Sequence, residues 1–227
     1  MKKLLVLFSA LLLTGIGSVA GAVTITKEFA SGDGGYTSPV QGAIIETFDN
    51  TENDGFVQSW TWTGSYQRVT GSQSGQYAAP SYVINEEIKS NATHYLVVPK
   101  DGDPAPKSAQ ANLNSTYNYL GLWWGSIDEY NKLELLLGDV VIATVVGKDV
   151  AKPPLVGPDN QLDPKYNQYV NIYTGNQLFD GFRMNSTQKA FEVDNIAVAR
   201  VPEPGTILLL GFGLVGLGMA RARRNQS

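Results

Sequence analysis

The sequence predicts an all-β fold, a two-sheet antiparallel sandwich with jelly-roll topology. Charged residues make up only 17% of the 227-residue chain, against roughly 25% in an average soluble domain. Short apolar segments alternate with turns rich in Gly, Pro, Asn and Asp, and hardly any segment has helical periodicity. About ten strand candidates in one domain are typical of a sandwich. We expect a signal peptide before this domain and a hydrophobic helix after it.

The strand candidates are short and close together. In the clearest alternating segment, Trp60 and Trp62 share one face and threonines occupy the other, as in a half-buried strand. The segments expected as strands are 43–48, 56–66, 94–98, 117–124, 133–146, 169–173, 181–185 and 191–199. The loops expected between them are 70–81, 99–107 and 151–167.

The segment 133–146 predicts a hairpin. Gly138-Asp139 lies in its middle, and glycine first in a two-residue loop suits a type II′ turn. Folding there places Ala143 and Val145 on a mixed face. The apolar face is expected to comprise Leu133, Leu135, Leu137, Val140 and Ile142.

The last strand predicts a β-bulge. Phe191 and Val193 have one parity, whereas Ile196 and Val198 have the other, so a regular strand would point one pair away from the core. One extra residue at Asp194-Asn195 restores the alternation.

Both chain ends carry targeting signals. Met1-Lys2-Lys3 is basic, residues 4–13 are apolar, and Ala20 and Ala22 form the small-x-small pattern cut by signal peptidase. Residues 1–22 are therefore expected to be a signal peptide, with a retained N-terminal anchor as the alternative. Residues 23–200 form the sandwich ectodomain, and residues 201–227 form a separate tail.

The tail has three parts. Pro202, Glu203 and Pro204 come first, and the prolines keep the chain extended. The apolar run 207–220 spans roughly 21 Å as a helix, short of a hydrocarbon core of ~30 Å. Its four glycines nevertheless disfavour the alternative of a buried core helix. A basic end follows, which resists translocation: Arg221, Arg223 and Arg224.

This tail resembles the PEP-CTERM sorting signal of Gram-negative bacterial surface proteins. The resemblance implies processing by exosortase, a membrane-embedded enzyme, and a precursor held in the membrane by its C-terminal segment. The body is also similar, over roughly 117–200, to a group of exosortase-dependent surface proteins. That similarity rests on 119–131, Tyr169-Val170-Asn171 and 191–196. It implies surface display and no enzymatic activity.

Composition narrows the possible partners. Residues 23–201 contain 12 Lys and Arg against 20 Asp and Glu, a net charge of −8, and no basic run. Nucleic acid is therefore not an expected partner. Because the chain has no cysteine, stability must come from packing or from a bound ion.

No catalytic motif is present. The single histidine, His94, lies in an expected strand, and no Ser-His-Asp or G-x-S-x-G context accompanies it. We therefore expect a protein without enzymatic activity and assign no catalytic residue. A paired-carboxylate hydrolase remains an alternative, but spacing singles out no pair among the acidic residues.

Tryptophans are the candidate ligand-binding residues. Exposed aromatic rings stack on sugars, whereas the alternative is that the rings fill the core. Adjacent tryptophans in a strand point to opposite faces, so one of the second pair need not be buried. The four candidates are Trp60, Trp62, Trp123 and Trp124.

A structural Ca²⁺ is the candidate cofactor. First and last strands of sugar-binding jelly rolls often lie side by side, and oxygen ligands cluster near both strands here. The alternative is that these residues bond their own turns. The proposed ligands are Glu46, Asp49, Asp54 and Asp194.

These observations predict an exported, exosortase-sorted surface or matrix protein that is adhesive or binds extracellular polysaccharide in a biofilm. Two alternatives stay open: a jelly-roll polysaccharide hydrolase or lyase, and a purely structural coat protein. An exposed aromatic strip would favour a polysaccharide-binding protein, and two carboxylates facing each other in one groove would favour an enzyme. A surface that has neither feature would favour the coat protein.

Processing gives a direct test of the tail. Co-expressed with its exosortase, the chain should lose the hydrophobic segment near Pro202-Glu203-Pro204, and Glu203→Ala should leave it uncut. The control Glu129→Ala, in the body, should be cut normally. Intact-mass measurement decides this, and a wild-type product still ending at Ser227 in an exosortase-positive host would contradict the assignment.

Overall fold

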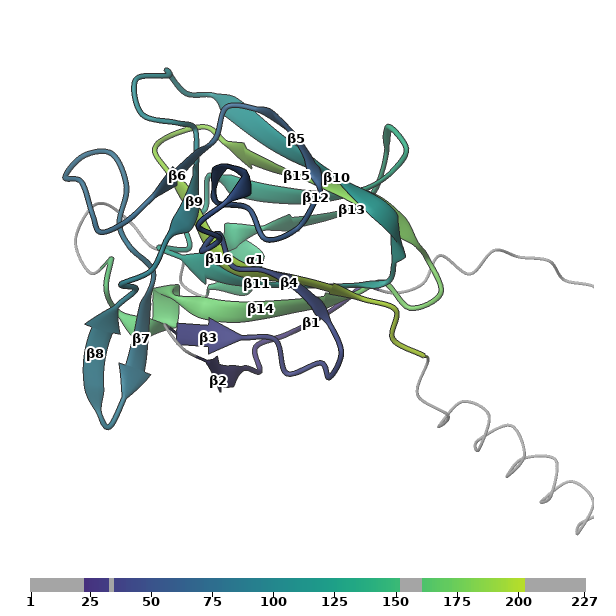
Figure 1. Cartoon of the computed structure of the whole chain (residues 1–227), viewed down its shortest axis with the longest axis horizontal. Helices are drawn as coiled ribbons and strands as arrows, with labels where there is room; N and C mark the ends of the chain where they lie inside the picture. Colours follow the sequence, from purple (N-terminus) through teal and green to yellow (C-terminus); the bar gives the residue numbers. More distant parts are fainter. Residues whose placement is uncertain (1–22, 33–34, 152–160, 203–227) are drawn as a thin grey trace, which may run out of the picture.

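The computed structural model describes residues 23–32, 35–151 and 161–202 (Figure 1). The expected signal peptide 1–22 and the tail from Glu203 onward lie outside the described residues. Within the described ranges, no helix is long and apolar enough to cross a membrane. The helix α1 (Gly147–Val150) is a single turn.

Two antiparallel sheets form the predicted sandwich. One has the order β1 (Thr24–Thr26), β14 (Gln168–Tyr173), β11 (Tyr119–Gly125), β16 (Phe191–Ala199), β9 (Tyr95–Val98), β6 (Gln67–Val69), with β4 (Ile44–Glu46) also paired to β16. The other has the order β13 (Val140–Val146), β12 (Asn131–Leu137), β15 (Phe179–Ser186), β10 (Lys107–Tyr117), β5 (Thr61–Gly64). Figure 1 shows β11, β14 and β16 of the first sheet below β10, β12 and β15 of the second.

The topology is that of a jelly roll, as the sequence predicts. Numbered one to eight, the strands from β9 to β16 lie in the order 1-8-3-6 in the first sheet and 2-7-4-5 in the second. The first and last strands of this set, β9 and β16, are neighbours, and β4 pairs with the remainder of β16.

Two short hairpins lie against the outer face of the first sheet, where Tyr36 and Tyr82 contact Trp123. They are β2 (Ala30–Gly32) with β3 (Gly35–Thr37) and β7 (Ser81–Ile84) with β8 (Glu87–Ser90). The 3₁₀ turns are η1 (Asn53–Gly55) and η2 (Pro164–Tyr166). Tyr36 packs on Trp123 with ring centroids 5.6 Å apart. A Cβ on Gly35 would meet the Trp123 ring at 2.0 Å, so this close approach requires glycine.

The main core fills the space between the sheets. Trp124 stacks on Phe191 with ring centroids 4.4 Å apart and an angle of 10° between the planes. Leu120, Leu135 and Phe182 are fully buried in the same cluster. Truncating one of these aromatic side chains to alanine costs roughly 3–5 kcal/mol.

The predicted bulge in the last strand is confirmed. Gly121 opposes Ala197, but Trp123 opposes Asp194, so β16 carries one extra residue. Asn195 adopts a φ of 47° there, a conformation that asparagine tolerates better than most residues. Phe191 and Ile196 consequently both face the main core despite their different parity.

The hairpin turn at Gly138-Asp139 is also confirmed, but its expected faces are wrong beyond the turn. Leu135 opposes Ala143 whereas Leu136 opposes Val141, which leaves Ile142 as an extra residue. This shift turns Ala143 and Val145 toward the core with Leu133 and Leu135. Leu137 and Val140 are exposed instead.

Two other expectations need correction. The expected strand 56–66 is a strand only at Thr61–Gly64, because the backbone N–H groups of Val57 and Gln58 donate to the Glu46 carboxylate and not to a neighbouring strand. The eleven-residue β10 was not expected. Its core-facing side chains include Ala109 and Ala111, which are too small to produce a clear apolar alternation.

Candidate functional site

The four candidate tryptophans differ in accessibility. Trp123 and Trp124 are 0% exposed and Trp60 is 7% exposed, so none of these three presents a sugar-stacking face. Trp123 and Trp124 do point to opposite faces, as expected. The outer-facing Trp123 is nevertheless covered, because Tyr36 and Tyr82 pack against it. Only Trp62 is partly exposed.

Trp62 lies in an aromatic hollow. This hollow has a volume of about 520 Å³. The ring of Trp62 is 5.6 Å from those of Phe56 and Tyr66, centroid to centroid, and all three are partly exposed. Asp54, Phe56, Val57, Gln58, Ser59, Trp60, Trp62 and Tyr66 line the hollow.

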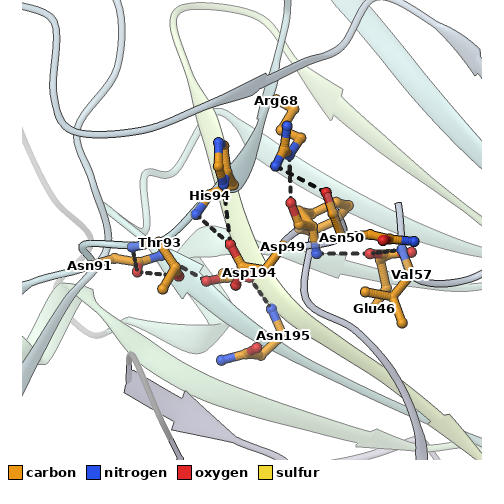
Figure 2. Close-up of polar contacts among 11 residues, drawn as sticks. Glu46, Asp49, Asn50, Val57, Arg68, Asn91, Thr93, His94, Asp194 and Asn195 are labelled. Atoms are coloured by element: carbon orange, nitrogen blue, oxygen red, sulfur yellow. Dashed lines mark hydrogen bonds and ion pairs between the residues drawn. The ribbon is translucent and has the colours of Figure 1, made fainter. Parts of the chain in front are cut away.

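Glu46 holds the loop that follows β4 (Figure 2). One carboxylate oxygen accepts from the backbone N–H groups of Phe48, at 2.8 Å, and Val57, at 2.9 Å. The other oxygen accepts from the backbone N–H of Gln58, at 2.7 Å. Burial raises the pKa of Glu46, and these three hydrogen bonds oppose the rise.

The neighbouring acidic groups are bonded in the same way (Figure 2). Asp49 accepts from the backbone N–H of His94 at 2.8 Å and lies 3.2 Å from Nδ1 of that ring. Asp194 accepts from Nδ2 of Asn91 at 2.7 Å and from the backbone N–H of Asn195 at 2.6 Å. Burial raises the pKa of Asp194 well above its ordinary value.

The predicted calcium site between the first and last strands stays a prediction. The expected adjacency is present, since Glu46 opposes Ile196 in the β4–β16 pair. However, the described residues contain no group of three or more His, Asp or Glu placed to hold a metal ion. The carboxylates of Glu46, Asp49 and Asp194 instead accept from N–H groups, and Asp54 is exposed at the aromatic hollow. Asp49 and Asp194 join segments far apart in the sequence, whereas the alternative places such bonds within the residues' own turns.

A second concave site brings together two carboxyl groups that the sequence did not single out. This polar pocket, of about 400 Å³, lies beside the loop 72–77. Asp128, which follows β11, and Glu192, in β16, both line it and are 5% and 1% exposed. Tyr130 and Lys189 line it too.

The two carboxyl groups are electrostatically unusual. Burial raises the pKa of Asp128 to about 7, although a hydrogen bond with Tyr130 opposes the rise. Burial raises the pKa of Glu192 well above its ordinary value, and the nearby charge of Asp128 adds to the effect. Perturbed carboxyl groups in a concave site are typical of functional positions. The one sequence signal was the pair of polar residues Ser126 and Asp128 directly after a strongly apolar strand.

The described fold ends at the sorting motif. Val201 donates its N–H to Oδ1 of Asn118 at 2.7 Å, and its carbonyl accepts from Nδ2 of Asn118 at 2.8 Å. Pro202, the next residue, is exposed. The candidate sorting residues Glu203, Pro204, Arg221, Arg223 and Arg224, and the cleavage residues Ala20 and Ala22, lie outside the described residues.

Comparison with known families assigns the tail. A model of the PEP-CTERM protein-sorting motif matches residues 200–224. The motif marks an exported protein whose membrane-anchored precursor is processed by exosortase and sorted to the cell surface, as the resemblance of the tail predicts. No curated protein and no solved structure matches the chain.

The raised pKa of Asp128 predicts a pH-dependent stability. An acid with a folded-state pKa above its unfolded value binds extra protons in the folded state, so its contribution is full at low pH and is lost as pH rises through about 7. Asp128→Asn should therefore reduce the fall in melting temperature between pH 5 and pH 8, and raise stability at pH 8. The removal of an exposed carboxylate, Glu87→Gln, is the control. An Asp128→Asn curve parallel to the wild type would refute the assignment.

Proposed function

We propose that the sandwich is a non-enzymatic polysaccharide-binding domain displayed on a Gram-negative cell surface or in its extracellular matrix. Signal peptidase removes residues 1–22, and exosortase then processes the PEP-CTERM tail. Adhesion through bound polysaccharide in a biofilm is the activity that such a location allows.

The aromatic hollow carries this proposal. Its three partly exposed rings, Phe56, Trp62 and Tyr66, offer apolar faces against which sugar rings pack. Asp54 and Gln58 line the same hollow and supply hydrogen-bonding groups for sugar hydroxyls. Concave sites that combine aromatic walls with a few polar groups are typical of small-ligand binding.

One observation favours the enzyme alternative. Asp128 and Glu192 line one pocket, and pairs of carboxyl groups carry out glycoside hydrolysis. A hydrolase or lyase would release new reducing ends or unsaturated sugars from a polysaccharide, whereas the proposed domain retains the polymer intact. A coat protein without a ligand would do neither.

The hollow predicts a specific binding defect. Tyr66→Ala removes one ring from the hollow and should weaken the affinity for the best-bound oligosaccharide of a glycan array about tenfold, or ~1.4 kcal/mol. The matched control is Tyr82→Ala, another partly buried tyrosine packed against a tryptophan but outside the hollow. Isothermal titration calorimetry measures both. Equal affinities for Tyr66→Ala and the wild type would remove the hollow from the proposal.

A further inference from the structure

The polar pocket contains a buried acid without a partner. One oxygen of Glu192, Oε1, accepts from the backbone N–H of Ala78 at 3.0 Å. The other, Oε2, is buried and has no hydrogen-bond partner among the described residues. Leaving such a group unpaired destabilises the folded state, so a native fold retains it only where something offsets the loss.

Two donor groups that line the pocket are already engaged with other partners. The single hydroxyl proton of Tyr130 is shared between the carboxyl group of Asp128 and the carbonyl of Lys189, which lies 2.9 Å from the hydroxyl oxygen. The ammonium group of Lys189 is engaged with the side-chain oxygen of Gln76 and lies 3.9 Å from Asp101. A ligand that brings its own hydrogen-bond donors would give the unpaired oxygen of Glu192 the partner that it lacks.

The geometry points to a binding site for one neutral sugar residue of a polysaccharide, with Glu192 Oε2 and the Asp128 carboxyl group as its hydrogen-bond partners. This inference takes its ligand class from the proposed function. It concerns a different place, because the polar pocket and the aromatic hollow share no lining residue.

A sugar fits better than the other donors. Each hydroxyl both donates and accepts, so it pairs with Glu192 whether that acid is ionised or protonated. The glutamines at the rim, Gln73, Gln76 and Gln188, have the same dual capacity. The volume of about 400 Å³ is within the ~300–1,000 Å³ range of small-ligand sites.

A divalent cation fits less well. Calcium requires six to eight oxygen ligands and ionised carboxylates. Burial disfavours the ionised forms of Asp128 and Glu192, as their raised pKa values indicate. Lys189 lines the same pocket, and its positive charge disfavours a cation there.

A neighbouring groove explains how a polymer would enter. Tyr130 lines both the polar pocket and an adjoining groove of about 860 Å³. Ser65, Lys107, Lys132 and Asn185 line that groove and supply hydroxyl, ammonium and amide groups. One sugar residue in the pocket would thus continue into the groove past the ring of Tyr130.

Binding to neutral hexasaccharides tests the inference. The full chain, in a zwitterionic detergent without a sugar headgroup, is titrated with cellohexaose, xylohexaose and mannohexaose in a calorimeter. The Tyr66→Ala variant should still bind one of them. Adding Glu192→Met, which keeps the side-chain volume but removes both oxygens, should weaken that binding at least tenfold. The matched control Glu87→Met changes an exposed glutamate and should have no effect.

Other outcomes of this titration would contradict the pocket, the hollow or both. If Tyr66→Ala abolishes binding and Glu192→Met alone does not weaken it, the pocket assignment is overturned and the aromatic hollow keeps its support. The reverse pattern would support the pocket and contradict the hollow. Thermal stabilisation by CaCl₂ that Asp128→Asn abolishes, or no binding to any hexasaccharide, would overturn the inference. If Glu192→Met does not fold, Asp128→Asn at pH 8 takes its place in the titration.

Discussion

The one-residue bulge in β16 is the constraint on which the rest of the molecule depends. All nine residues of this strand are buried, and it lies between β11 on one side and β9 and β4 on the other. Without the extra residue at Asn195, one half of the strand would turn its apolar side chains away from the core. The same strand supplies Glu192 to the polar pocket and Asp194 to the hydrogen bonds drawn in Figure 2. The sorting motif begins directly after it, at residue 200. One strand therefore contributes to the core, to the candidate site and to the position of the sorting motif.

Buried carboxyl groups serve two purposes in this cysteine-free domain. Glu46 and Asp194 accept from N–H groups with both oxygens, and they hold loops and the bulge where a secreted protein often uses disulfides. Glu192 differs, because one of its oxygens has no partner. Fully bonded acids stabilise a fold, whereas an unpaired one adds a cost that a ligand removes. The contrast separates these structural acids from Glu192, which we assign to binding together with Asp128.

The sequence predicted the apolar strands and the bulge, because these follow from alternation within one segment. It predicted the jelly roll from the number of short strands in one domain. It missed β10, whose buried residues are mostly alanines, and it misjudged the face of Val145, because a bulge inside a hairpin leaves no local mark. The sequence also could not show which exposed faces are covered by distant segments. Tyr36 packs on Trp123, although the two residues are far apart in the sequence. Asp128 and Glu192 meet only because β11 and β16 are neighbours, so their pocket could not be inferred from spacing.

Deleting Asn195 tests the central role of the bulge most directly. The deletion should turn Ile196 and Val198 outward, each losing roughly 1.5–3 kcal/mol of burial, and should abolish cooperative thermal unfolding or lower the midpoint by many degrees. The control Asn195→Gly keeps the strand length and the positive φ, and loses a single hydrogen bond from Asn195 to the Tyr36 carbonyl. It should melt close to the wild type by circular dichroism. A deletion variant that melts as cooperatively and at the same temperature as Asn195→Gly would contradict the account.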